Sequence, residues 1–121
     1  MSNYGIGGHY EPHFDHDEKR HERKEVAPEV VDHGDRIATL MIYLNNVEVG
    51  GATVFPKLNL AARPVKNAAI FWYNYQRSGS MDPLSLHAAC HVVIGEKWVA
   101  NKWIREHGQQ FHRRCSLTSD R

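Results

Sequence analysis

The clearest hydrophobic pattern in the chain is a nearly continuous apolar run from Ile37 to Leu44, typical of a strand buried on both faces. Shorter apolar segments follow at 52–55, 68–73, 86–94 and 98–104. Turn residues separate these segments, among them Asn45-Asn46, Gly50-Gly51 and Gly95-Glu96-Lys97. The series contains no convincing amphipathic helix. Several short strands with turn signals between them predict an all-β sandwich or barrel.

Two more polar segments precede this series. Residues 10–15 have an extended character, and Pro12 within them argues against a helix and favours an edge or irregular strand. Residues 16–35 are rich in Glu, Lys, Arg and His and poor in apolar residues. We therefore expect a charged, mobile surface loop there, with room for a helical turn. In this interpretation its histidines are solvated loop residues, namely His16, His21 and His33.

Length and charge narrow the possible classes. At 121 residues the chain has the size of one domain, and its densest motif follows so soon after residue 1 that we expect a full-length protein to carry residues before it. The net charge of +1, without a basic patch interleaved with aromatics, argues against nucleic acid as a partner. No apolar stretch approaches the roughly 18 residues that a membrane span needs, and no apolar signal-peptide core is present.

The segment His13-Phe14-Asp15 offers two metal ligands in close succession. Residues i and i+2 of a strand point to the same face, so His13 and Asp15 can converge on one ion while Phe14 packs on the other side. With nine histidines in the chain, such a pair also arises by chance. Alone, the pair is a weak signal.

His87, at the start of a later predicted strand, can complete the set if the fold brings it beside the first pair. Two histidines and one carboxylate form the facial triad that suits non-haem Fe(II) and leaves three positions for other ligands. Zinc prefers a closed four-ligand site or a single open position, and it stays a competitor because His9 and His16 are near.

Lys97 lies in the turn that follows the His87 strand. From there its ammonium group can project into a barrel and pair with a carboxylate of a bound ligand, since a carboxylate removed from water needs a charged, hydrogen-bonded partner. The alternative is an ordinary turn lysine.

The only cysteines, Cys90 and Cys115, allow two interpretations. They can form one disulfide, which would constrain the unfolded chain by ~3 kcal/mol, or they can stay as two free thiols.

Five blocks of the chain carry a resemblance: Asn3-Tyr4-Gly5-x-Gly7-Gly8-x-Tyr10-Glu11-Pro12-His13-Phe14-Asp15, Gly50-Gly51-Ala52-Thr53-Val54-Phe55, Phe71-Trp72-Tyr73-Asn74, His87-Ala88-Ala89-Cys90 and Gly95-x-Lys97-Trp98-Val99-x-Asn101-Lys102-Trp103. Together they closely resemble the catalytic domain of the collagen prolyl 4-hydroxylase α subunit. The resemblance runs from Asn3 to about Cys115. Several blocks in the right order are far more specific than a single triad.

The resemblance implies a double-stranded β-helix, or jelly-roll barrel, truncated on its N-terminal side. It implies that residues 1–121 are part of one Fe(II)- and 2-oxoglutarate-dependent dioxygenase domain. The iron ligands are then His13, Asp15 and His87, and Lys97 holds the distal carboxylate of 2-oxoglutarate. Four further residues fall where the family lines its cosubstrate and substrate cavity, namely Tyr4, Tyr10, Thr53 and Trp103. For Tyr10 and Trp103, core packing is the alternative.

The activity implied by the resemblance is proline 4-hydroxylation in collagen-like (procollagen) polypeptides, with release of succinate and CO2 and with L-ascorbate as a further cofactor. A protein disulfide isomerase subunit is the implied partner. Cys90 and Cys115 match the family's disulfide pair, which implies a disulfide bond and the lumen of the endoplasmic reticulum.

The chain also departs from the family. His91 stands where the family usually has Pro, and residues 16–35 differ from the corresponding loop. The family's preceding helices, first barrel strand, peptide-binding domain and dimerisation region have no counterpart, so we expect an uncovered sheet edge and apolar surface. Two rival functions are a zinc-binding structural domain and a non-catalytic module that docks proline-rich peptides on an aromatic surface of Trp72, Tyr73 and Tyr75.

Overall fold

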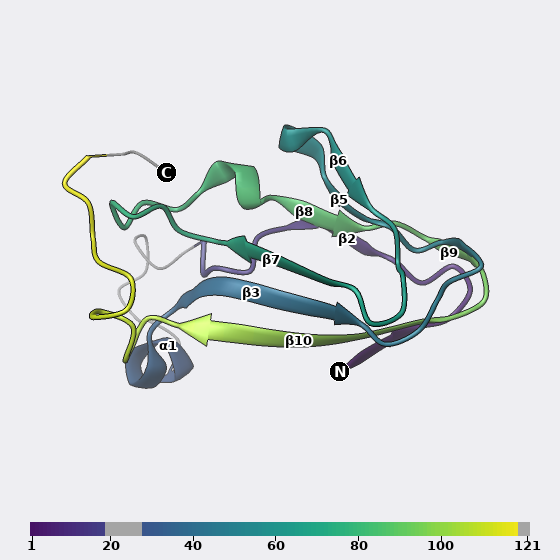
Figure 1. Cartoon of the computed structure of the whole chain (residues 1–121), viewed down its shortest axis with the longest axis horizontal. Helices are drawn as coiled ribbons and strands as arrows, with labels where there is room; N and C mark the ends of the chain where they lie inside the picture. The colour runs from purple at the N-terminus through teal and green to yellow at the C-terminus, as the bar shows by residue number, and fades with distance from the viewer. Residues whose placement is uncertain (19–27, 119–121) are drawn as a thin grey trace.

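The computed structural model describes residues 1–18 and 28–118, and short antiparallel strands make up most of it (Figure 1). The strands are β1 (Ser2–Tyr4), β2 (Tyr10–His13), β3 (Arg36–Tyr43), β4 (Val49–Gly50), β5 (Thr53–Phe55), β6 (Leu60–Ala62), β7 (Ala69–Tyr73), β8 (His87–Ala89), β9 (Val92–Ile94) and β10 (Lys97–Arg105). The helical elements are α1 (Pro28–His33) and two 3-10 turns, η1 (Pro56–Leu58) and η2 (Pro83–Ser85). No helix of these described residues is long and apolar enough to cross a membrane.

The strands form two four-stranded sheets, with the orders β1-β10-β3-β7 and β2-β8-β5-β6, and a two-stranded ribbon of β4 and β9. All the pairings are antiparallel. Figure 1 shows β3, β7 and β10 side by side, with β2, β5 and β8 forming the other layer. This arrangement confirms the predicted all-β jelly roll. It also confirms that the Pro12 segment is an edge strand, because β2 ends the second sheet.

The core lies on the inner face of the first sheet. Tyr43 of β3 pairs with Val99 of β10, and both pack with Met41 in one buried cluster. Alternate residues of β3 face outward, where Leu40 and Ile42 are only half-buried. The prediction that this strand is buried on both faces is therefore wrong. The apolar outer face of β3 continues onto β7, which is an edge strand. Phe71 and Tyr73 of β7 are exposed, so apolar surface is uncovered there, as expected from the sequence.

The predicted strand 86–94 is in fact two strands. β8 pairs with β2 and β5, whereas β9 pairs with β4, and the chain changes partner at Cys90 and His91. The backbone of Gly50 makes this crossing possible. Its φ is +88°, and a Cβ atom there would lie 2.3 Å from the carbonyl oxygen of His91. A run of apolar residues cannot reveal such a change of partner, because both halves have strand character.

The segment expected to be a loop, 16–35, contains α1, while its residues 19–27, including His21, lie outside the described residues. His33 is exposed as expected. The interpretation of His16 as a solvated residue is wrong, because it is 6% exposed. Its ring stacks on Phe14, with centroids 4.7 Å apart, and lies 5.5 Å from the ring of Tyr75. These aromatic contacts bury it.

Candidate active site

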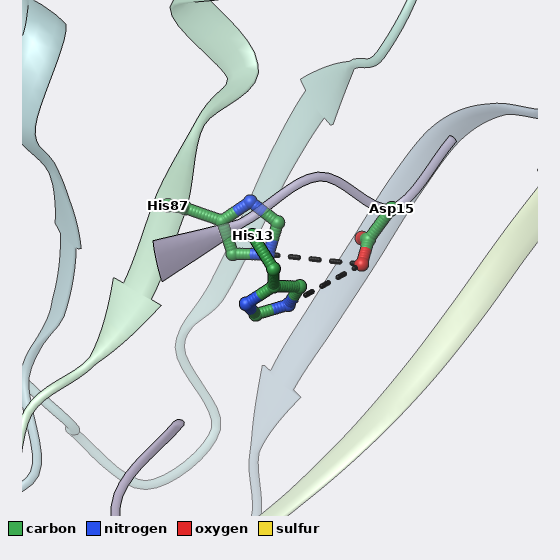
Figure 2. A group of neighbouring side chains, drawn as sticks. All are labelled: His13, Asp15 and His87. Atoms are coloured by element: carbon green, nitrogen blue, oxygen red, sulfur yellow. Dashed lines mark ion pairs between the residues drawn. The ribbon is translucent and has the colours of Figure 1, made fainter. Parts of the chain in front are cut away.

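The pairing of β2 with β8 brings together the two predicted histidine ligands. His13 is the last residue of β2 and His87 is the first of β8, and they are direct partners across the ladder. The expected strand geometry of His13-Phe14-Asp15 is wrong in one respect, since β2 ends at His13. The chain still returns the Asp15 carboxylate to the histidines. Its Oδ1 lies 3.7 Å from Nε2 of each ring (Figure 2).

The hydrogen bonds of both histidines fix which ring nitrogen faces Asp15. Nδ1 of His13 lies 2.7 Å from the carbonyl oxygen of Glu11, and Nδ1 of His87 lies 2.8 Å from that of Ser85. A carbonyl oxygen only accepts, so each ring carries its proton on Nδ1 and turns the lone pair of Nε2 toward the carboxylate. Backbone carbonyls commonly orient metal-binding histidines in this way.

The electrostatics of the group also favour a cation. Burial is the main cause that lowers the pKa of His87, so the imidazole tends to be neutral and able to bind metal, although the Asp15 carboxylate opposes the shift. The possible ligand atoms of His13, Asp15 and His87 lie within 4.8 Å of one another. Two imidazole nitrogens and one carboxylate oxygen fit the facial triad of non-haem Fe(II).

A cavity of about 340 Å³ opens in front of these side chains, between the two sheets. Every site residue predicted from the sequence lines it, namely Tyr4, Tyr10, His13, Asp15, Thr53, His87, Lys97 and Trp103. The residues come from five strands and from the segment after β2. The jelly roll therefore gathers into one cavity residues that are far apart in the sequence.

Lys97, the first residue of β10, is buried inside the cavity and is 1% exposed. Burial lowers its pKa to about 8, and the nearby Cys90 opposes the shift. Its Nζ lies 3.5 Å from Oγ1 of Thr53 and 5.4 Å from the centre of the Tyr4 ring. Within residues 1–18 and 28–118, no carboxylate forms an ion pair with it. A buried ammonium group that no described carboxylate neutralises is suited to bind an anion.

Tyr43 contacts Thr53 without itself lining the cavity, and it was not singled out from the sequence. Its hydroxyl lies 2.8 Å from Oγ1 of Thr53, and Nζ of Lys97 lies 5.6 Å from its ring centre. Burial raises its pKa, so the phenol keeps its proton and can donate it. The sequence did hold a signal for it. Tyr43 carries a hydroxyl in an otherwise apolar predicted strand, and it is two residues from Met41, so both side chains point to the same face.

Tyr10 and Trp103 lie at the open side of the cavity. Tyr10 is 52% exposed and its ring centroid lies 4.0 Å from that of His13, while Trp103 is 39% exposed. These exposures exclude core packing for either residue. Arg36, which was also missed, places its guanidinium carbon 3.8 Å from the Trp103 ring centre, so a cation and two aromatic rings border the opening.

The predicted disulfide is not formed in this structure, in which Cys90 and Cys115 are both free. The reason is the path of the C-terminal segment, which Figure 1 shows at the end of the barrel away from β9. Arg113 donates to the carbonyl of Tyr75 at 2.8 Å and stacks over the ring of Tyr73. These contacts hold Cys115 beside the loop after β7, whereas Cys90 lies at the end of β8.

The aromatic docking surface of the rival peptide-binding hypothesis is also wrong. Trp72 points into the cavity, with its ring centroid 4.8 Å from that of His87. Tyr75 is buried and donates its hydroxyl proton to Asp35. Tyr73 is exposed but lies under Arg113. The three rings therefore share no common surface.

Comparisons with known proteins agree with this geometry. The chain is 56% identical to prolyl 4-hydroxylase subunit alpha-3 of Homo sapiens over 98% of its length and 21% of the relative, and 49% identical to subunit alpha-2 of Caenorhabditis elegans over 99% of its length and 22% of the relative. It thus spans about a fifth of these curated relatives. The crystal structure of the viral collagen prolyl hydroxylase vCPH from Paramecium Bursaria Chlorella virus-1, in its 2OG complex, superposes with a TM-score of 0.71 at 35% identity, over 85% of this chain and 55% of that one. The model of the 2OG-Fe(II) oxygenase superfamily matches residues 1–105, and the chain therefore belongs to that superfamily.

Proposed function

We propose that the chain is the catalytic part of a prolyl 4-hydroxylase that uses Fe(II) and 2-oxoglutarate to hydroxylate proline in collagen-like polypeptides. The observation that carries the proposal is the presence, in one cavity, of the triad of His13, Asp15 and His87 and of the buried cation Lys97. We further propose that residues 1–121 form part of a single dioxygenase domain. The names of the relatives and of vCPH support the substrate class.

In this proposal the triad holds Fe(II) through Nε2 of both histidines and Oδ1 of Asp15. Bound iron would supply the activation of O2, which is coupled to the conversion of 2-oxoglutarate to succinate and CO2 and to oxygen transfer to the substrate. Two imidazoles and a single carboxylate leave positions for a chelating cosubstrate. The protein contributes the orientation of the reactants and a cavity that shelters them from bulk water.

Lys97 binds the distal carboxylate of 2-oxoglutarate in this proposal, helped by the hydroxyl of Thr53, to which the Tyr43 hydroxyl donates. Lys97 and Thr53 are buried in the lining of the cavity, and Nζ of Lys97 lies 3.5 Å from Oγ1 of Thr53. Tyr43 is also buried, and its hydroxyl lies 2.8 Å from the same Oγ1 atom. A charge-assisted hydrogen bond there fixes one end of the dicarboxylate. Its other end can then reach the triad, because His13, Asp15 and His87 line the same cavity as Lys97.

The proline-containing substrate enters on the side of Tyr10 and Trp103, which are the exposed aromatic residues of the cavity. An apolar ring such as that of proline packs well on aromatic faces, while Arg36 can bind a backbone carbonyl of the peptide.

We extend the proposal to L-ascorbate as a reductant, to a protein disulfide isomerase subunit as partner, and to the lumen of the endoplasmic reticulum as the location. These three rest on the resemblance to prolyl 4-hydroxylase α subunits.

The test is decarboxylation of 2-oxoglutarate with a Pro-Pro-Gly repeat peptide, measured with and without Fe(II) on the longest available form of the protein. Succinate and 4-hydroxyproline formed in equal amounts, and only with Fe(II), are the expected result. Binding of the peptide without consumption of 2-oxoglutarate would instead favour a non-catalytic module. Retention of Zn(II) rather than Fe(II) after anaerobic purification would favour a structural zinc site.

A further inference from the structure

Asn74, the residue after β7, is fully buried and makes hydrogen bonds that determine how its amide is turned. Its Oδ1 accepts from the indole Nε1 of Trp72 at 3.0 Å, and its Nδ2 lies 3.1 Å from the carbonyl oxygen of Arg36. The indole nitrogen can only donate and the carbonyl oxygen can only accept. These two partners fix the orientation of the Asn74 amide, because a flipped amide would place its nitrogen against the indole donor and its oxygen against the carbonyl acceptor.

The same amide nitrogen donates a second hydrogen bond, to Oγ1 of Thr39 at 3.1 Å. Thr39 is 1% exposed, and its Oγ1 lies 2.6 Å from Oδ2 of Asp15. Since the hydroxyl accepts from Asn74, its single proton is left for the Asp15 carboxylate. The hydrogen bonds therefore run in one direction, from Asn74 through Thr39 to Asp15.

This direction determines which carboxylate oxygen is available to a metal. Oδ2 of Asp15 is occupied by the Thr39 hydroxyl, while Oδ1 faces Nε2 of both histidines (Figure 2). We infer that Asn74 is a positioning residue that acts through Thr39 to hold the Asp15 carboxylate in the rotation that presents Oδ1 to the metal. The inference rests on the proposed role of Asp15 as a ligand. It gives a function to the last residue of the block Phe71-Trp72-Tyr73-Asn74.

The first test measures the affinity for Co(II). The visible absorption of the bound ion reports binding, in the absence of 2-oxoglutarate and peptide. Thr39→Val keeps the shape of the side chain but removes the hydroxyl, and it should weaken binding about 10- to 100-fold, the usual cost of losing such a supporting hydrogen bond. Thr39→Ser retains the hydroxyl and should restore affinity. Tyr75→Phe is the control, because it removes a buried hydroxyl that donates to Asp35 rather than to a metal ligand, and it should leave Co(II) affinity unchanged.

The second test asks whether Asn74 acts through Thr39. Asn74→Ala should weaken Co(II) binding in the wild-type background and have no further effect in Thr39→Val, because the hydroxyl that it orients is already absent. Equal losses in both backgrounds would overturn the inference. Thermal unfolding reports whether Asn74→Ala folds, and Asn74→Ser replaces it in the same comparison if it does not.

A further variant separates this inference from the proposed metal site. Asp15→Ala should abolish specific Co(II) binding. If Asp15→Ala binds Co(II) like the wild type, the proposed site is wrong and the positioning role is lost with it. If Asp15→Ala loses the metal while Thr39→Val keeps wild-type affinity, the metal site stands and the positioning role is refuted.

Discussion

His13 and His87 are direct cross-strand partners, with ring centroids 4.3 Å apart and with both Nδ1 atoms against backbone carbonyls. Their relative position is therefore set by the β2–β8 ladder and not by a loop. Rigid elements hold ligands more accurately than loops do, and the carboxylate of Asp15 completes the group from the adjoining segment. Removal of either imidazole, of His13 or of His87, should therefore be enough to disrupt metal binding.

His87→Ala should remove metal-dependent 2-oxoglutarate decarboxylation, with a loss larger than the about 100-fold that removing an outer-shell partner can cost. In the proposed site, the variant deletes one of the three ligands found among the described residues. His91→Ala is the matched control, since His91 is exposed, lies just beyond the same strand and stacks on His9 away from the triad. Equal activity of the two variants, measured as succinate formed per enzyme, would refute the role of His87.

Lys97 gives a pH-dependent prediction for the cosubstrate. Its pKa is lowered to about 8, so the free enzyme loses the positive charge as the pH rises through about 8. Binding of a carboxylate needs that charge, and the KM for 2-oxoglutarate should therefore increase between pH 7 and 9 while the change in kcat is smaller. The saturation curve at each pH is the measurement.

Lys97→Ala should have a high KM for 2-oxoglutarate that no longer changes around pH 8. Lys102→Ala, on the same strand but exposed, should keep the wild-type pH profile. A wild-type profile in Lys97→Ala would exclude Lys97 from binding the cosubstrate carboxylate.

Much of the site was predictable because its key residues occur in short blocks with strong chemical identity. His87 and Lys97 carry metal-binding or charged atoms in segments that are otherwise apolar or turn-like, whereas His13 and Asp15 are recognised by their spacing of two residues. The repeated short strands and turns predicted an all-β sandwich or barrel, and the resemblance to the collagen prolyl 4-hydroxylase α subunit narrowed this to the jelly roll. What the sequence alone leaves open is the pairing of the strands, which decides which of these residues meet.

The missed residues are polar groups within apolar strands. Thr39 and Tyr43 lie in an apolar segment that predicts only core packing. Their importance comes from hydrogen bonds to Asp15 and Thr53, which are 24 and 10 positions away along the chain. The very short strands β1, β4 and β6 have too few residues for a period to appear. The disulfide was expected from matching positions, but its geometry depends on the path of the last residues, which the Arg113 contacts decide.

Two buried histidines make the stability of the metal-free protein depend on pH. Burial is the main cause that lowers the pKa values of His16 and His87 below 6.5. The unfolded chain therefore binds more protons in this range, and the free energy of unfolding should fall as the pH drops below about 6.5. Urea denaturation between pH 5 and 8 measures this. The slope should be smaller in His16→Phe, which keeps the stacking on Phe14, than in the wild type, and a pH-independent wild type would contradict the prediction.

The final prediction concerns the crossing at Gly50, where β4 passes His91. Gly50 and Gly79 have similar positive φ values, +88° and +86°, but a Cβ atom at Gly79 has nothing within 4 Å, whereas one at Gly50 would lie 2.3 Å from a backbone carbonyl oxygen. Gly79→Ala should therefore cost only the left-handed backbone strain, about 1 to 2 kcal/mol. Gly50→Ala adds a clash with backbone that cannot rotate away, and its loss of unfolding free energy should clearly exceed that of Gly79→Ala. Urea denaturation of the two variants gives the comparison directly, and equal losses would mean that the approach of β4 to His91 is less close than the structure has it.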